Sequence, residues 1–187
     1  MVGSVHPLKR QDEAITALLE VVRRGINAQL LIVGDGPKRF RAALHQLVED
    51  YGLTQRVKFV GYSENPIHIM RMADVVLMCS RWEAFGRATV EAMLAGKPVI
   101  GTANSGGTAE LIQDGITGLL YKAGDHDELA SKIQFLYENP EEKLKLGSTA
   151  HLWATGRFTQ ERYAKEILTL LNKVLTMEKT SPPNLSN

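Results

Sequence analysis

The chain has 187 residues, 44% of them hydrophobic and 6% aromatic, so it can bury one sizeable core, as one domain or as one half of a two-domain enzyme. Its 22 Lys and Arg residues nearly balance 21 Asp and Glu residues, and the net charge of +1 argues against the broad basic surface that non-specific nucleic-acid binding requires. No apolar run approaches the roughly 20 residues needed to span a membrane, and the N-terminus lacks the apolar region of a signal peptide.

Short β-branched runs alternate with amphipathic helical patterns from the N-terminus to Tyr121. In chain order we expect the strand VGSV (2–5), a helix at 11–24, the strand AQLLIVG (28–34), a helix at 39–50, the strand VKFVGY (57–62), a short helix at 66–72, the strand DVVLMCS (74–80), a helix at 87–95, the strand PVIGT (98–102), a helix at 108–113 and the strand GLLY (118–121). Beyond Tyr121 the pattern is helical only, over residues 125–138, 140–154 and 158–175.

This order of elements predicts the fold class. Strands that are almost continuously apolar and separated by helices indicate a parallel sheet covered on both faces. We predict a doubly wound, Rossmann-like α/β domain over residues 1–177, with about six strands, a helical C-terminus and a flexible tail at 178–187. In such folds, ligands bind at the loops that follow the carboxyl ends of the strands.

The loop GDGPKR (34–39) follows a strand and opens a helix, which is the context of a dinucleotide-binding fingerprint. The fingerprint fails because Arg39 stands at the third glycine position. Gly34 and Gly36 therefore mark either a tight turn with unusual backbone angles or a point where the backbone lies against a ligand.

Metal-binding patterns are weak along the chain. Asp125 and Asp127 have a spacing that could hold a cation, but an Asp before a helical run, with Glu128 in its first turn, is typical of an N-cap. The five histidines lack metal-ligand spacing, so we predict no metal site. We expect the other four to be structural or solvated and leave open the role of His6, which lies in a loop after a strand. The single cysteine, Cys79, is expected to be a buried thiol, which fits a reducing cytosol.

The stretch SRWEAFGRATVEAMLAGKPVI (80–100) combines several features at one place. Glu83 should lie at the carboxyl end of a strand, and Gly86 should let the chain turn tightly into the next helix. A helix N-terminus of this kind suits a pyrophosphate. Glu91 lies inside that helix, where its carboxylate is either solvated or aimed at the paired hydroxyls of a ribose.

The segment EAFGRATVE in this stretch matches the Glu-x7-Glu motif of retaining glycosyltransferases of the B-type fold, and the chain resembles the donor-binding half of glycosyltransferase family 4, the "glycosyl transferases group 1" domain. The continuation EAMLAGKPVIGTANSGGTAELIQDGITGLLY is similar to that family too. So are VGSVHPLKRQDEAI, LLIVGDGP, VKFVGY and FTQERYAKEILTLL, so that the resemblance covers nearly the entire chain.

The resemblance implies roles for particular residues. Glu91 would hold the donor ribose, and Glu83 would contact hydroxyls of the transferred sugar as a catalytic residue. The amides around Phe85, Gly86 and Arg87 would lie against sugar and phosphates.

The same resemblance implies a phosphate grip after the first strand. Lys9 fits the lysine that grips the pyrophosphate and is the second expected catalytic residue, but Ser4 stands where the family has an arginine. Either Ser4 itself bonds the phosphate, or His6 or Arg10 compensates. The loop around Gly34 and Gly36 is expected near the nucleotide base.

The resemblance also implies an activity. The chain would be the donor-binding, C-terminal half of a retaining, metal-independent glycosyltransferase of polysaccharide or glycolipid biosynthesis, with a UDP-, GDP- or ADP-sugar as donor. It would be inactive without an N-terminal acceptor-binding domain, and it would be cytoplasmic, with the full enzyme at the inner face of a membrane as a further location. Two other readings are a stand-alone, non-enzymatic nucleotide-binding module and a nicotinamide-dependent oxidoreductase, the latter disfavoured by Arg39.

Overall fold

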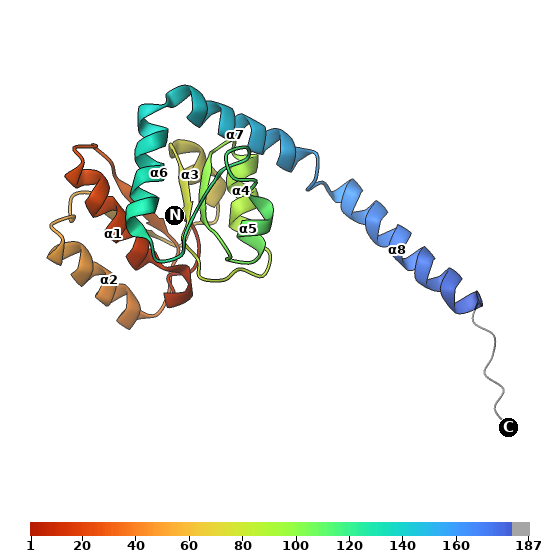
Figure 1. Ribbon diagram of the computed structural model, residues 1–187. Helices are drawn as coiled ribbons and strands as arrows, with labels where there is room; N and C mark the ends of the chain where they lie inside the picture. Colours follow the sequence, from red (N-terminus) through yellow and green to blue (C-terminus); the bar gives the residue numbers. More distant parts are fainter. Residues whose placement is uncertain (181–187) are drawn as a thin grey trace.

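A computed structural model describes residues 1–180 and shows an α/β body from which a long C-terminal helix projects (Figure 1). The elements in chain order are a 3₁₀ helix η1 (Pro7–Lys9), α1 (Gln11–Arg23), β1 (Leu30–Val33), α2 (Lys38–Asp50), β2 (Val57–Gly61), α3 (Pro66–Met72), β3 (Val76–Met78), α4 (Arg87–Leu94), β4 (Val99–Thr102), α5 (Gly107–Leu111), β5 (Leu119–Tyr121), α6 (His126–Glu138), α7 (Pro140–Thr155) and α8 (Gln160–Thr180). The predicted alternation of strands and helices is confirmed.

The strands pair in parallel, which confirms the doubly wound α/β class, but they form two sheets instead of one. Within residues 1–180, one sheet has the order β1-β2 and the other β3-β4-β5, which gives five strands where about six were expected. The difference lies at the N-terminus, where only Val2 makes a ladder bridge, to Val33. Gly3 has a φ of 145°, so the backbone leaves the line of a strand after this single bridge.

The core lies between the sheets and the helices that cover them. One cluster joins α1 and α6 to both sheets and includes Ile15, Ile100 and Leu129, each less than 2% exposed. A second cluster joins α4 and α7 through Met93 and Ala150. Close packing of this kind fixes where the carboxyl ends of the strands lie, and the loops that follow them form the candidate site.

Two predictions about single residues are confirmed inside this frame. The Asp125 side chain accepts a hydrogen bond from the Glu128 N–H at 2.9 Å, so it caps α6. Cys79 is buried, and burial raises the pKa of its thiol to about 12, which keeps the thiol protonated and unreactive.

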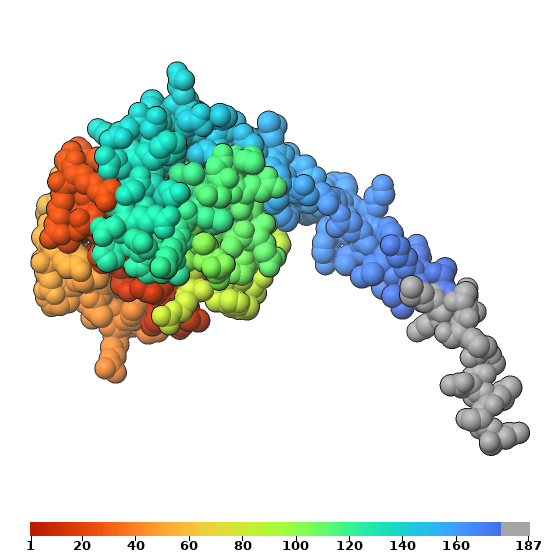
Figure 2. Space-filling model, viewed as in Figure 1, coloured from red at the N-terminus to blue at the C-terminus, as the bar shows by residue number. Residues whose placement is uncertain are grey.

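Helix α8 stands away from the body, and its described side chains are exposed (Figures 1 and 2). It ends at Thr180, so the first three residues of the tail expected at 178–187 are helical, while residues 181–187 lie outside the described part of the chain. Within residues 1–180, no helix has the length and apolar character that a membrane crossing would need.

Candidate functional site

Three loops meet beyond the carboxyl ends of the strands. The loop after β3 bonds to the loop after β4 twice, since the Glu83 N–H donates to the Ser105 carbonyl and the Gly107 N–H donates to the Glu83 carbonyl, both at 2.8 Å. The Arg81 N–H donates to the Leu8 carbonyl at 2.8 Å, which joins the loop after β3 to η1. The backbone therefore holds Glu83 between two neighbouring loops.

The Glu83 carboxylate is the centre of this arrangement. Its Oε1 accepts hydrogen bonds from Lys9 Nζ and from Ser80 Oγ, the latter at 2.7 Å, and the side chain is 14% exposed. The fold thus brings together the two expected catalytic residues across 74 positions of sequence. Ser80 was missed by sequence reasoning, and the available signal was a hydroxyl ending an apolar strand three residues before Glu83.

Glycines let the loops approach α4. Gly86, the N-cap of α4, has a φ of 83°, and a Cβ on Gly107 would lie 2.4 Å from the Phe85 carbonyl oxygen. The first N–H groups of α4, those of Arg87 and Ala88, have no partner within the helix by its geometry. Together with the positive end of the helix dipole, they favour an anion beside Gly86.

Glu91 lies one turn further along α4 and pairs with Arg87, whose Nε is 3.2 Å from Glu91 Oε1. The Glu91 side chain is 22% exposed and that of Arg87 is 87% exposed, so solvent reaches the pair. Its carboxylate is thus available to a ligand at the cost of one weak surface ion pair.

The glycines of the loop after β1 pack directly on the N-terminal segment. A Cβ on Gly34 would lie 1.9 Å from the Gly3 carbonyl oxygen, and one on Gly36 would lie 1.9 Å from the Val5 carbonyl oxygen. Backbone packing alone therefore requires both glycines, and Gly34 also has the unusual backbone angle that was expected, with a φ of 139°. The exposed Ser4 lies within this packed segment.

Arg10 does not offer a free cation in place of the arginine missing at Ser4. The Arg10 backbone is in the left-handed region, with a φ of 52°. Its side chain is paired twice, since Nε lies 3.2 Å from Asp12 Oδ1 and Nη2 lies 3.2 Å from Glu13 Oε2. Burial lowers the pKa of Arg10, but the hydrogen bond and the charges of these carboxylates outweigh it and raise the pKa. His6 is exposed, and its Nδ1 accepts the Leu8 N–H at 3.2 Å.

Unbonded polar atoms and aromatic rings border the three loops. Among the described residues, Ser105 Oγ and Gln11 Oε1 are buried without a hydrogen-bond partner. Phe85 is 53% exposed and packs edge-on against Phe158, with ring centroids 5.8 Å apart. Within residues 1–180, no group of three His, Cys, Asp or Glu side chains could hold a metal ion. The arrangement offers a cation, helix N–H groups and carboxylates, a set suited to a phosphorylated, hydroxyl-rich ligand.

Comparisons with known proteins identify the family of the chain. Residues 1–153 match the family model described as "Glycosyl transferases group 1". The chain is 32% identical over 178 residues to the N-acetyl-alpha-D-glucosaminyl L-malate synthase of Bacillus anthracis, covering 95% of this chain and 46% of that protein. It is 33% identical over 175 residues to the GDP-mannose-dependent alpha-(1-6)-phosphatidylinositol monomannoside mannosyltransferase of Mycobacterium tuberculosis, covering 88% of this chain and 44% of that protein.

A solved structure has a fold similar to that of this chain. Anabaena Alr3699/HepE in complex with UDP has a similar fold, with a TM-score of 0.85 and 32% identity over 92% of this chain and 48% of that chain. The chain spans about half the length of the curated relatives it matches.

Proposed function

Because the chain belongs to the glycosyl transferases group 1 family, we propose that it binds the nucleotide-sugar donor of a retaining glycosyltransferase of family 4. The observation that carries the proposal is the convergence of Lys9, Ser80 and Glu83 beside the N-terminus of α4. Cationic, amide and carboxylate groups there match the three parts of such a donor, namely its pyrophosphate, its sugar and its ribose.

Each group has a distinct role in this proposal. Lys9 and the first amides of α4 neutralise the pyrophosphate, and they stabilise the charge that develops on it as the sugar leaves. Glu83, held by Ser80 and by the loop after β4, accepts hydrogen bonds from sugar hydroxyls. Glu91 accepts hydrogen bonds from the ribose.

Binding of the donor changes the partner of Lys9. Without a ligand, Lys9 pairs with Glu83, and a pyrophosphate beside α4 would compete with that carboxylate for the ammonium group. Release of the pair would leave Glu83 oxygens free to accept sugar hydroxyls. Lys9 would thus bind the pyrophosphate and Glu83 the sugar of the same donor. In this proposal no metal ion is needed to balance the phosphate charge.

In this proposal, the acceptor site lies on an N-terminal domain, and sugar transfer requires that domain together with this chain. Closing a cleft over donor and acceptor can supply about 7 to 11 kcal/mol of the barrier, and this chain carries only the donor side. We therefore expect donor binding, and no sugar transfer, from residues 1–187 without an N-terminal acceptor-binding domain. We also propose the cytoplasmic location that the single thiol led us to expect. The alternative function is that of a stand-alone, non-enzymatic nucleotide-binding module.

A thermal-shift panel tests the proposal. UDP fits because a structural neighbour was solved with UDP, and GDP, ADP and the corresponding sugars complete the panel. A nucleotide at about 100 times its dissociation constant stabilises the fold by roughly 2.7 kcal/mol, which raises Tm by about 5 to 10 °C. The shift should persist in EDTA.

Two results would contradict the proposal. The first is no shift with any nucleotide. The second is a shift that EDTA removes, that Mg²⁺ restores and that Asp127→Ala abolishes, which would assign the phosphate to a metal at the start of α6. Asp127 is the suitable position because Asp125 caps α6, so that its loss would by itself lower the stability that the assay measures.

A further inference from the structure

A row of aromatic rings connects the candidate site with the end of α7. Phe85, in the loop of residues 83–86 (the donor loop), packs edge-on against Phe158, with ring centroids 5.8 Å apart. Phe158 in turn packs edge-on against Trp153 of α7, with ring centroids 5.7 Å apart. The Arg157 guanidinium lies over the Trp153 ring, 4.9 Å from its centroid. The donor loop is therefore in contact with an element that is distant from it in sequence.

Phe158 is fixed to the body of the protein through α7. Its N–H donates to the Ala154 carbonyl at 2.9 Å, which holds it to the last turn of that helix. A Cβ on Gly147 would lie 2.4 Å from the Gly96 carbonyl oxygen, so α7 is in close contact with the chain just after α4. Because Phe85 precedes α4, α7 runs antiparallel to α4 and carries Phe158 back to the N-terminal end of α4. The packing of these two helices thus holds the Phe158 ring beside the donor loop.

The donor loop has few other restraints. Its backbone bonds to the loop after β4 are made by Glu83, and within residues 1–180 the backbone of Ala84 and of Phe85 makes no hydrogen bond. On one side, the Phe85 backbone packs on Gly107, where a Cβ would lie 2.4 Å from the Phe85 carbonyl oxygen.

On the other side, the Phe85 ring packs on Phe158. Because the Phe85 N–H is not bonded within the described chain, packing on these two sides sets the direction in which it points. The ring pair is thus one of the contacts that shape the loop on which the proposed donor contacts depend.

We propose that Phe158 is a positioning residue of the donor site: its ring holds Phe85, and through it the donor loop, in the conformation that presents the loop amides to the donor. This inference rests on the proposed function, in which those amides lie against sugar and phosphates. Because the loop is ordered before the donor binds, binding loses less conformational entropy. One edge-on ring pair makes a modest contribution, which corresponds to about a two- to tenfold change in affinity.

Calorimetric titration of the full chain tests this inference, with whichever of UDP, GDP and ADP binds the unaltered protein. Phe158→Leu keeps an apolar side chain but removes the ring, and it should weaken nucleotide binding about two- to tenfold. Phe158→Tyr keeps the ring and should bind within about twofold of the unaltered chain. Phe85→Leu, at a half-exposed position, should show the same loss as Phe158→Leu, and the double variant should lose no more than either one, because the two rings act as a pair.

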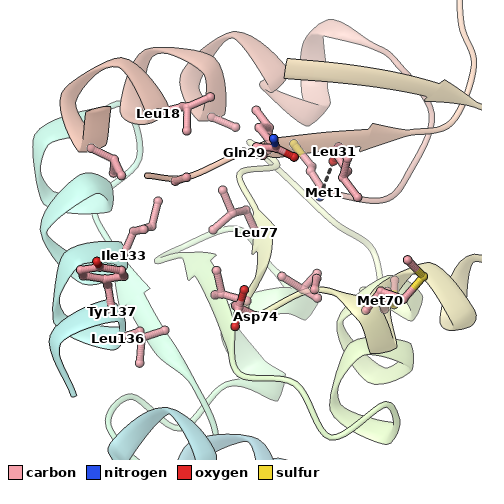
Figure 3. Close-up of a pocket in the computed structure, with 18 of the residues that line it drawn as sticks. Met1, Leu18, Gln29, Leu31, Met70, Asp74, Leu77, Ile133, Leu136 and Tyr137 are labelled. Atoms are coloured by element: carbon pink, nitrogen blue, oxygen red, sulfur yellow. Dashed lines mark hydrogen bonds between the residues drawn. The ribbon is translucent and has the colours of Figure 1, made fainter. Parts of the chain in front are cut away.

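A control variant separates positioning from stability. Ile133→Ala enlarges an apolar cavity of about 610 Å³ between the two sheets (Figure 3). None of the proposed donor-binding residues lines this cavity, and its walls include Leu18, Leu77 and Leu136. The control should therefore lower Tm and leave the nucleotide affinity unchanged.

The chain without nucleotide gives a second readout. NMR order parameters of the Ala84 and Phe85 amides should fall in Phe158→Leu and stay unchanged in Phe158→Tyr and in the control. Nucleotide affinity that is equal in the unaltered chain and in Phe158→Leu would overturn the inference and leave the proposed function standing. So would losses that add up in the double variant. No nucleotide binding by the unaltered chain would contradict the proposed function and the inference with it.

Discussion

Glu91 and Glu20 are two helical glutamates with nearly the same surroundings. Each pairs with an arginine on its own helix, and their side chains are 22% and 23% exposed. They differ in place, since Glu91 lies in α4 beside the loop of Glu83 and Glu20 lies near the end of α1. This pair separates a role in ligand binding from a role in helix stability.

We expect Glu91→Ala to weaken binding of the cognate nucleoside diphosphate by roughly 1.5 to 3 kcal/mol, the scale of hydrogen bonds to a charged group. Calorimetric titration measures this loss. Glu20→Ala removes an equivalent ion pair and should leave the affinity unchanged. Equal nucleotide affinities in the two variants would contradict the proposed contact between Glu91 and the ribose.

At the scale of elements, α8 contributes little to the stability of the body. None of its described side chains is buried, and several of its apolar residues are exposed, among them Leu168, Leu170, Leu171 and Leu175. By contrast, α7 buries Leu146 and Ala150 against the rest of the protein. Two helices that follow each other along the chain should therefore respond differently to deletion.

A chain that ends at Thr159, without α8, should unfold within about 2 °C of the full chain, because no buried apolar surface is lost. Calorimetric melting measures this. A chain that ends at Glu138 also loses α7, and it should lose several kcal/mol of stability or fail to fold. A large loss of stability on removal of α8 alone would show that it packs on the body in solution.

Helix limits could be predicted where the signals are local. Asn65 before Pro66 at the start of α3, and Asp125 before α6, are cap signals, and the structure has both caps. The first strand could not be predicted as well. VGSV has strand-like residues, but only Val2 bridges to β1, because pairing depends on a partner distant in sequence and on the turn at Gly3.

At the scale of the whole molecule, the sequence indicated which residues belong to the site but not how they touch. Glu83 and Lys9 came from a motif, yet their ion pair depends on how the loops meet, with 74 positions between them. Ser80 and Ser105 were missed because the position of Ser80 after an apolar strand is only a weak signal, and the bond from the Glu83 N–H to the Ser105 carbonyl depends on how two loops meet. The split into two sheets likewise follows from long-range pairing.

Stability should depend on pH through the buried amino terminus. Its pKa is lowered from 8.0 to about 6 in the folded chain, so the unfolded chain binds more protons between these values. The free energy of unfolding should therefore rise from pH 6 to pH 8, by up to about 3 kcal/mol, and this gain is lost as pH falls. Urea unfolding at several pH values measures it.

The control for this pH dependence is a chain acetylated at Met1. It has no titrating α-amino group but keeps all five histidines, so the difference between the two curves isolates the terminus. Identical slopes in the two chains would mean that the Met1 ammonium is solvated and not buried beside Leu31.

The most direct test of the proposed donor site is an amide-resolved NMR titration of the chain with UDP, repeated with GDP and ADP. With the nucleotide that binds, the account predicts the largest shifts in η1, in the loop that holds Gly34, at residues 83–91 and at residues 104–107. It predicts no comparable change around Leu18, Leu77 and Leu136, which line the cavity between the sheets. Shifts confined to the cavity, or none at Gly86 and Glu91 with a nucleotide that binds, would contradict the account.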